Sequence, residues 1–526
     1  MSSSVISKDV LVLGAGVSGL VAAKCLAEDG YTVGVIERSS DVGGLWTFRE
    51  NDYGVMRCTH INVSKYNYAF SDFPFPEDVP DYPHHSDMAR YIKDYADKFG
   101  LLKMIDFNKK VITVEQVGEK WQVTCVQVGE DGQEKGDSKI IYTSSYLAVT
   151  TGHHAKPSWP KFEGEETFPG KIIHAVDYKD PDFNDCAGKK VLIVGIGNSA
   201  VDVAVDCATL GRCPEVTIST RSGAWIIPNY IFGLPTDLYA CRFFFLFPRA
   251  VANLIFGLII SLLSGSPWKW GLNPKMKPLE TQPTVSPTLV HHIQRRNIKI
   301  APNVVKIEGS KVHFVNGTSA EYDRIIYCTG YKIDLPFLPS LIKDQVLKEG
   351  SNEIKLYKNV FAPDVGPSLA FIGFVQPASG GIITMSETQA RWFAQLCKGR
   401  EVKLPSRQDM IADMDTDKRS QQGRWYKTAR HTLQKDPTVY NDEIASLFGA
   451  KPNLLANPFL AWRLFFGSGG ASQWRLNGPN KWSGAPEQIK RVPLPGLWNL
   501  TGYLLLASLL VLITLTLRCF CALFCF

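Results

Sequence analysis

Two copies of a glycine-rich dinucleotide-binding pattern constrain this chain more than any other feature of its sequence. The first reads DVLVLGAGVSGL and the second KKVLIVGIGNSAVDVAVDCA, and in each a short apolar run leads into closely spaced glycines and then a helical stretch. This order is typical of a strand, a tight turn and a helix within a βαβ unit. We therefore predict an α/β protein with two doubly wound, Rossmann-like dinucleotide-binding folds.

The first unit carries Gly14, Gly16 and Gly19, and its second strand, YTVGVIE, ends in Glu37. The first glycine makes the tight turn, the second lets the backbone approach a pyrophosphate, and the third lets the helix pack closely on the strand. A carboxylate at the end of the second strand accepts hydrogen bonds from ribose hydroxyls and would repel a 2′-phosphate. The first site is thus predicted to bind FAD or NAD, and not NADP.

The second unit carries Gly195 and Gly197, with Ala200 in the third position, where alanine is tolerated. Its next strand, EVTISTRSGAW, ends at Arg221 beside two hydroxyl side chains instead of at an acid. A fork-shaped guanidinium and hydroxyls suit a 2′-phosphate, so this site is predicted to bind NADPH. The pair of sites predicts a flavoprotein in which NADPH reduces FAD.

Composition narrows the class of protein further. The 526 residues are enough for three or four domains, and 57 basic residues are spread among 51 acidic ones without a long block, which gives nucleic-acid binding little support. The 12 cysteines lack metal-binding spacing, so no metal site is expected and the thiols are predicted to be reduced. Cys58 lacks a partner in sequence, which argues against a disulfide reductase, while a simple dehydrogenase or quinone reductase stays open on these grounds.

The C-terminal end is far more apolar than the rest of the chain. Residues 497–517 read LWNLTGYLLLASLLVLITLTL, which as a helix would span a hydrocarbon core of ~30 Å. We expect a membrane anchor with Trp498 and Tyr503 near one interface and a cytosolic body, because Lys490 and Arg491 precede it. A buried core helix is the alternative. Three of the cysteines, Cys519, Cys521 and Cys525, lie in this tail.

A second apolar stretch, residues 243–263, is interrupted by Pro248 and Arg249. A charged residue and a proline would sit badly in the middle of a membrane span. This insertion is expected to lie on the membrane or to line a substrate channel, and a second span is the less favoured interpretation.

Between the two units lies FPGKIIHAVDY, in which Phe168, Gly170, His174 and Tyr178 occupy the fixed positions of F-x-G-x-x-x-H-x-x-x-Y/F. This signature resembles that of the flavin-containing monooxygenases, and the resemblance is nearest to the animal, membrane-bound members. It extends almost from end to end through further matching segments: GGLW (43–46), SDFPFP (71–76), YCTGY (327–331), ETQARW (387–392), GAKPNLL (449–455) and GPNKWSGA (478–485).

The resemblance implies NADPH- and O2-dependent oxygenation of small lipophilic amines and sulfides, giving N-oxides and S-oxides through a C4a-hydroperoxyflavin. It also implies a catalytic role for Asn62, whose amide would touch both the flavin oxygen adduct and the nicotinamide. The implied location is the endoplasmic reticulum membrane, with the catalytic domains facing the cytosol and with membrane lipid as a partner of the C-terminal helix and the insertion. The sequence does not determine the oligomeric state, and a homo-oligomer is one of the possibilities.

Other functions remain as alternatives. The same chemistry could perform Baeyer–Villiger oxygenation of ketones, although the signature of that class usually ends in Trp where this chain has Tyr178. An uncoupled NADPH oxidase that releases H2O2 is a third enzyme. A membrane-bound flavoprotein scaffold without turnover is the alternative from another class.

The residues expected to bind FAD are Gly14, Ala15, Gly16, Val17, Ser18, Gly19, Glu37, Leu45, Trp46, Asn62 and Val63; those expected to bind NADPH are Gly195, Gly197, Asn198, Ser199, Ala200, Val201, Asp202 and Arg221. The expected domains are an FAD domain from 1–155 and 331–445, an NADPH domain from 156–330 with an apolar insertion at about 230–290, a connecting region from 446–496 and an anchor from 497–526.

Overall fold

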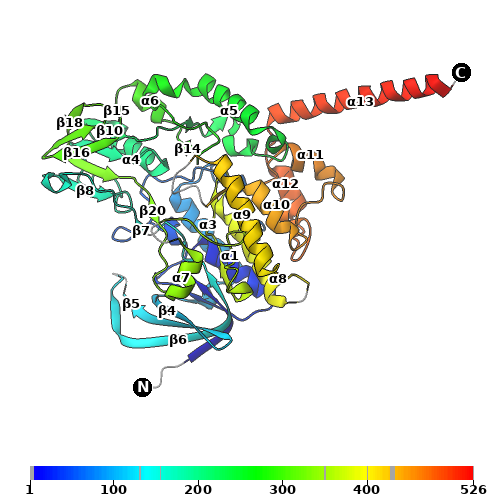
Figure 1. Cartoon of the computed structure of the whole chain (residues 1–526), viewed down its shortest axis with the longest axis horizontal. Helices are drawn as coiled ribbons and strands as arrows, with labels where there is room; N and C mark the ends of the chain where they lie inside the picture. Colours follow the sequence, from blue (N-terminus) through cyan, green and yellow to red (C-terminus); the bar gives the residue numbers. More distant parts are fainter. Residues whose placement is uncertain are drawn as a thin grey trace.

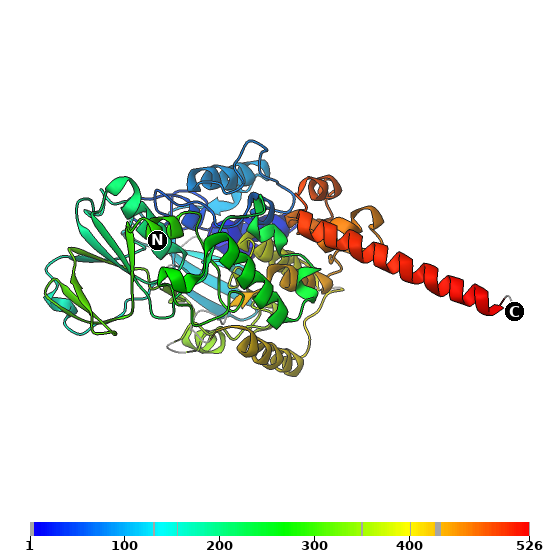
Figure 2. The same cartoon turned by 90° about the horizontal axis from the view of Figure 1, so that it is seen from above.

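The computed structural model describes residues 5–129, 132–154, 156–348, 351–399, 401–426 and 433–524. The expected domain boundary at Ala155 and the tail residue Cys525 lie outside these ranges. Figures 1 and 2 show a body with two sheets and a long C-terminal helix that projects away from it.

The first sheet is built around the first glycine motif. Its strand order is β3-β2-β1-β6-β5-β4, with β21 paired to β6, and its central strands are parallel. The strands are β1 (Val5–Leu13), β2 (Val33–Ile36), β3 (Ile105–Asp106), β4 (Lys109–Val117), β5 (Lys120–Val128), β6 (Glu134–Val149) and β21 (Leu369–Phe371).

The second sheet is built around the second motif and is parallel throughout. Its order is β15-β10-β9-β19-β8. The strands are β8 (Lys171–His174), β9 (Lys190–Val194), β10 (Glu215–Ser219), β15 (Ile298–Ala301) and β19 (Arg324–Tyr327). A three-stranded antiparallel sheet follows β15 in the chain: β16 (Val304–Glu308), β17 (Lys311–Phe314) and β18 (Ser319–Glu321).

Short strand pairs connect these parts. Where the chain leaves the first sheet and returns to it, β7 (Lys156–Pro157) pairs antiparallel with β20 (Tyr331–Lys332). The segment between β10 and β15 contains β11 (Ile226–Ile227), β12 (Tyr230–Ile231), β13 (Leu234–Pro235) and β14 (Thr284–Val285). Near the C-terminal region, β22 (Gln376–Pro377) pairs with β23 (Gln434–Lys435).

Helices cover the sheets and form most of the C-terminal part. In the first fold, α1 (Val17–Glu28) packs against α8 (Ile382–Lys398), and both helices are largely buried. Most buried side chains of α1 are apolar, whereas α8 also buries polar side chains such as Glu387 and Arg391. The other helices are α2 (Lys65–Tyr68), α3 (His85–Lys98), α4 (Asn198–Ala208), α5 (Arg249–Ser264), α6 (Leu289–Gln294), α7 (Ser340–Val346), α9 (Arg407–Arg424), α10 (Pro437–Ser446), α11 (Pro458–Phe466), α12 (Ala485–Arg491) and α13 (Gly496–Phe524).

The start of α13 is fixed to the body. Trp498 is 9% exposed, donates its indole N–H to the backbone oxygen of Tyr239 at 3.1 Å, and packs against Phe243. The predicted place of Trp498 near a membrane interface stays a prediction, and in the body its ring packs against the apolar insertion. Leucines farther along α13, such as Leu504 and Leu510, are exposed.

Within the described part of the chain, with α13 taken as far as Leu512, no single helix is long and apolar enough to cross a membrane. One pair, Ala485–Arg491 with Gly496–Leu512, could cross together by length and composition alone, and its two parts are bent by 103°.

Candidate functional site

One cavity of about 1680 Å³ is bordered by the first glycine turn and by the N-terminal half of α4, whereas Gly195 and Gly197 are not among its lining residues. The first fold contributes Gly14, Gly16 and Glu37 to its lining, and the second contributes Asn198 and Asp202. The cavity therefore joins the two predicted nucleotide sites.

The first turn has the shape that a dinucleotide needs. Gly14 has φ +105°, and a Cβ on Gly19 would lie 1.8 Å from the Gly14 oxygen, so a bare glycine is required for α1 to approach β1 this closely. At Gly16 the nearest atom to an added Cβ is the Gly44 Cα at 3.7 Å. The N-terminus of α1 thus presents backbone donors beside open space, which fits a pyrophosphate.

Glu37 follows β2 and is 7% exposed. Its Oε2 accepts the Ala15 N–H at 2.6 Å, and its Oε1 accepts the N–H and hydroxyl of Ser39 at 2.8 and 2.7 Å. These bonds hold the carboxylate at the wall of the cavity. Because each carboxylate oxygen can accept more than one hydrogen bond, Glu37 still fits a ribose hydroxyl.

The second turn repeats this arrangement with one difference. Gly195 has φ +129°, and a Cβ there would lie 2.4 Å from the Cys328 oxygen. The third position is Ala200, whose methyl group is fully buried. This helix therefore tolerates a side chain at the position where α1 does not.

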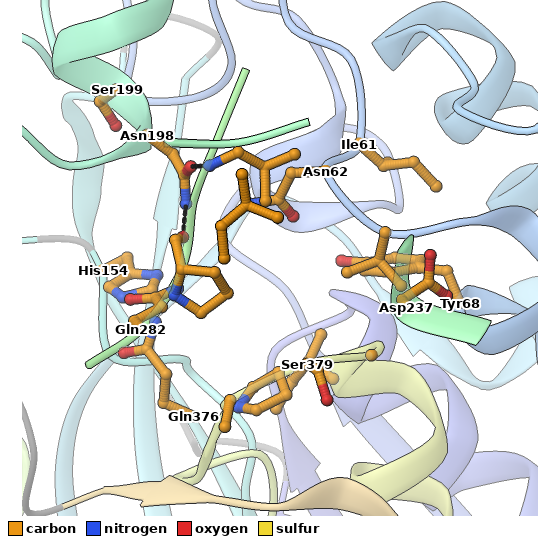
Figure 3. A pocket seen from close by; sticks show the side chains of 18 of the residues that line it. Ile61, Asn62, Tyr68, His154, Asn198, Ser199, Asp237, Gln282, Gln376 and Ser379 are labelled. Carbon is orange, nitrogen blue, oxygen red and sulfur yellow. Dashed lines mark hydrogen bonds between the residues drawn. The ribbon is translucent and has the colours of Figure 1, made fainter. Parts of the chain in front are cut away.

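Asn198 begins α4 and was predicted to touch NADPH. Its Oδ1 accepts the Val285 N–H at 2.8 Å, and its Nδ2 donates to the Pro283 oxygen at 3.3 Å (Figure 3). The side chain thus ties α4 to β14 at the cavity wall.

Arg221 lies two residues beyond β10, is exposed, and is absent from the cavity lining. It forms no hydrogen bond or ion pair with any described residue, so its guanidinium is available to a ligand. The neighbouring hydroxyls are engaged: Ser219 donates to the Pro302 oxygen at 2.8 Å, and Thr220 accepts the Gly223 N–H at 3.0 Å. The 2′-phosphate role of Arg221 stays a prediction.

Asn62 lines the cavity together with Val63, Leu45 and Trp46 (Figure 3). The Trp46 ring meets Tyr68 edge-on, with ring centroids 5.7 Å apart. The Asn62 amide has no hydrogen-bond partner within the described part of the chain. Its amide is thus free to meet a bound molecule, and its catalytic role stays a prediction.

Asp202 lines the cavity one helical turn before Asp206. Burial, and to a smaller extent the Asp206 carboxylate, raise the pKa of Asp202 to about 7. The Tyr178 hydroxyl donates to Asp206 at 2.9 Å, so the end of the segment FPGKIIHAVDY contacts α4. Sequence reasoning selected Asp202 by its motif position and missed this carboxylate pair.

Part of the predicted apolar insertion lines the cavity. The chain makes a short turn at Phe244–Leu246, and α5 begins immediately after Pro248. The inner side of this segment lines the cavity through Phe244, Phe256 and Ile259. Its outer side exposes Leu254, Leu258 and Leu262. A lining role is thus observed, as expected for one of the two interpretations.

Two buried polar groups escaped the sequence analysis. One is Asp237, an acid within the apolar insertion that also lines the cavity. The other is Arg475, fully buried, which forms ion pairs with Glu387 at 2.7 Å and Asp72 at 3.3 Å. The segments SDFPFP and ETQARW supply Asp72 and Glu387, but one sequence does not reveal that they meet.

Comparisons with known proteins agree with this geometry. The model of the family described as Flavin-binding monooxygenase-like matches residues 7–492. The chain is 36% identical to flavin-containing monooxygenase 5 of Cavia porcellus over 92% of this chain and 91% of the relative. It is 34% identical to dimethylaniline monooxygenase [N-oxide-forming] 2 of Mus musculus, over 92% and 91% of the two chains.

A solved structure shares the fold. The S-allyl-L-cysteine S-oxygenase from Allium sativum superposes with a TM-score of 0.62 at 22% identity, covering 84% of this chain and 88% of the other. The chain belongs to the flavin-binding monooxygenase-like family, and it is an NADPH-dependent monooxygenase whose cofactors are FAD and NADPH.

Proposed function

We propose that the protein uses NADPH and O2 to oxygenate soft nucleophilic nitrogen and sulfur in small lipophilic amines and sulfides. The carrying observation is the cavity itself, whose lining joins Gly14, Gly16 and Asn62 to the apolar side chains of Phe244, Phe256 and Ile259. A lone pair on nitrogen or sulfur needs no acid or base for activation. A lipophilic substrate of this kind would pack against the apolar side chains of these three residues.

The cofactor positions follow from the two turns. The Gly14–Gly19 turn and Glu37 would hold FAD, with Leu45, Trp46 and Val63 around it, and the Gly195–Ala200 turn with Arg221 would hold NADPH. When bound and reduced by NADPH, FAD supplies the redox chemistry that activates O2 and delivers one oxygen atom to the substrate. This division corresponds to an FAD domain (1–155 and 331–445) and an NADPH domain (156–330).

Asn62 is the proposed catalytic residue. Its Nδ2–H donates a hydrogen bond without a readily transferred proton, and an amide does not titrate. Preorganised donors of this kind stabilise developing charge in a site that excludes water.

We also propose that the body lies on the cytosolic face of the endoplasmic reticulum membrane. The support is an exposed apolar surface formed by the outer leucines of α5, by Leu455 and Phe459 near α11, each more than nine-tenths exposed, and by the leucines of α13. Exposed apolar side chains in such number are typical of a surface that meets lipid or another protein. When a microsomal preparation is centrifuged, truncation before Gly496 should move most of the protein from the membrane pellet to the supernatant. The exposed leucines of α5 should keep the remaining part in the membrane pellet.

The test of the activity is product analysis with purified enzyme, NADPH and O2. A thioether, a tertiary amine and a cyclic ketone are supplied separately, and sulfoxide, N-oxide, lactone and H2O2 are measured per NADPH. Sulfoxide and N-oxide are expected as the main products. Lactone as the main product would identify a Baeyer–Villiger enzyme, H2O2 alone would identify an NADPH oxidase, and no NADPH consumption would identify a protein without turnover.

A further inference from the structure

Asp237 is a buried acid at the cavity that the proposed chemistry does not use. It lies in the 3₁₀ turn Thr236–Tyr239, within the apolar insertion, and is 8% exposed. A carboxylate in such a place is costly unless hydrogen bonds satisfy it. Its partners therefore indicate why it is there.

The Asp237 carboxylate accepts three hydrogen bonds, and all three come from Ser64 and Asn67, in the segment that follows Asn62. Oδ1 accepts the Ser64 N–H at 3.0 Å, and Oδ2 accepts the Ser64 hydroxyl and the Asn67 amide, each at 2.7 Å. Ser64 stands at the N-cap of α2, where its side chain makes no capping bond and its hydroxyl donates to Asp237 instead. Both carboxylate oxygens are thus occupied by one short piece of chain.

Asn67 extends this connection to two other regions. Its Oδ1 accepts the Ser468 hydroxyl at 2.7 Å, and its backbone oxygen accepts the Gly381 N–H at 3.2 Å, just before α8. Residues 64–67 are therefore held at once by the insertion, by the start of α8 and by the C-terminal region. The Asn62 side chain has no partner within the described chain, so its position depends on this backbone.

Resting on the proposed function, we infer that Asp237 is a positioning residue that fixes Asn62 in the cavity through Ser64 and Asn67. The apolar insertion, which lines the cavity, would thereby set the position of the Asn62 amide in the same cavity. A displacement of about 1 Å at such a group can lower catalysis roughly 100-fold. The consequence expected here is a loss of coupling between NADPH oxidation and oxygenation, while flavin reduction continues.

Asp237→Asn tests this inference with a change of a single group. Three donors converge on the two oxygens, and an amide replaces one oxygen by an NH2 donor, so a donor would face a donor on one side. We expect product per NADPH to fall and H2O2 per NADPH to rise about 10-fold. The rate of flavin reduction under anaerobic NADPH should stay within about twofold, since no hydride-transfer contact changes.

Asp442→Asn is the matched control. Asp442 receives two hydrogen bonds from Arg242 of the same insertion, at 2.9 and 2.6 Å, and the side chains of both residues are 14% exposed. It also accepts the Trp474 indole N–H at 2.9 Å, so it too is a largely buried carboxylate that ties the insertion to another part of the chain, but within the described residues it forms no hydrogen bond with residues 62–67. This variant should lower the unfolding temperature and leave the ratio of product to H2O2 unchanged.

Ser64→Ala is a smaller change to the same hydrogen bonds, and it serves as the second test if Asp237→Asn does not retain FAD. It removes one of the three donors, so a smaller shift toward H2O2 is expected. In the double variant, the loss of coupling should be less than the sum of the two single effects, because both changes act on one unit.

Several outcomes would overturn the inference. Unchanged coupling in Asp237→Asn and Ser64→Ala would do so, as would an equal loss in Asp442→Asn. A raised KM for NADPH with unchanged coupling would instead assign Asp237 to direct nucleotide binding. If the wild-type enzyme forms no oxygenated product at all, the proposed function fails, which is a separate result.

Discussion

The two glycine motifs show how one backbone pattern forms two different sites. In the first, a Cβ at Gly19 would meet a backbone oxygen at 1.8 Å, and Glu37 is buried and held by three hydrogen bonds. In the second, Ala200 already carries a buried methyl group, and Arg221 is exposed and has no partner in the described chain. The first site holds its acid in place by hydrogen bonds at the cavity wall, whereas the second presents its cation to solvent.

This difference separates the turn from the recognition residue. Both turns place a helix N-terminus beside the cavity, which suits any pyrophosphate. The residue after the second strand of each fold is expected to distinguish a free ribose hydroxyl from a 2′-phosphate. This residue is the buried Glu37 in the first site and the exposed Arg221 in the second. A resident FAD in the first site and an exchanging NADPH in the second are the behaviour that this comparison predicts.

The largest effect is expected where the packing is tightest. Gly19→Ala should abolish FAD binding and lower stability by more than about 3 kcal/mol, because the new Cβ overlaps a carbonyl oxygen that the β1–α1 turn fixes. Ala200→Gly, the reciprocal change, should cost only about 1 kcal/mol as a glycine within a helix. The ratio of FAD to protein and the unfolding temperature measure both, and a folded, FAD-loaded Gly19→Ala protein would refute the tight-packing argument.

Asn62→Leu tests the group that lies between the two sites. NADPH should still reduce the flavin, but oxygen should be diverted, with product per NADPH falling about 10-fold as H2O2 rises, because a donor of this kind contributes roughly that much or more. Simultaneous assays of NADPH, product and peroxide give the ratio. An unchanged product yield would remove Asn62 from the catalytic assignment.

Arg221→Glu tests the recognition residue of the second site. We expect KM for NADPH to rise about 10-fold or more, since a charge-assisted hydrogen bond contributes about 1.5–3 kcal/mol, and KM for NADH to change little. Arg295→Glu, at another exposed position of the same fold, serves as the control. Equal losses for NADPH and NADH would mean that Arg221 does not recognise the 2′-phosphate.

The smallest effect concerns Asp202 in the second site. Because its pKa is raised to about 7 from an ordinary value of 3.8, the folded state keeps a proton that the unfolded state loses between these values. Its contribution to stability therefore falls as pH rises from about 4 to 7. Asp202→Asn should raise the unfolding temperature by about 2 °C or more at pH 8 and by less at pH 5.5. The exposed Asp182→Asn is the control, and a gain that does not grow with pH would contradict the assignment.

The sequence predicted the two folds well because the signal is local: strand, turn and helix lie within about 25 residues of one another. It also placed Asn62 in the cavity through the family resemblance. It could not predict the bond between Asp237 and Ser64, or the ion pair between Glu387 and Arg475, because such partners meet only after the chain has folded. The contact of Trp498 with Tyr239 was missed for the same reason, since Tyr239 belongs to the distant insertion.

Oxygen labelling in a single turnover tests the central claim most directly. The enzyme is reduced with NADPH, mixed with ¹⁸O₂ and given a thioether, and the label in the sulfoxide is measured by mass spectrometry together with NADPH oxidised and H2O2 formed. The account predicts one ¹⁸O atom per sulfoxide and one NADPH oxidised per product, with little H2O2. An unlabelled sulfoxide, or NADPH oxidation that yields only H2O2, would contradict it.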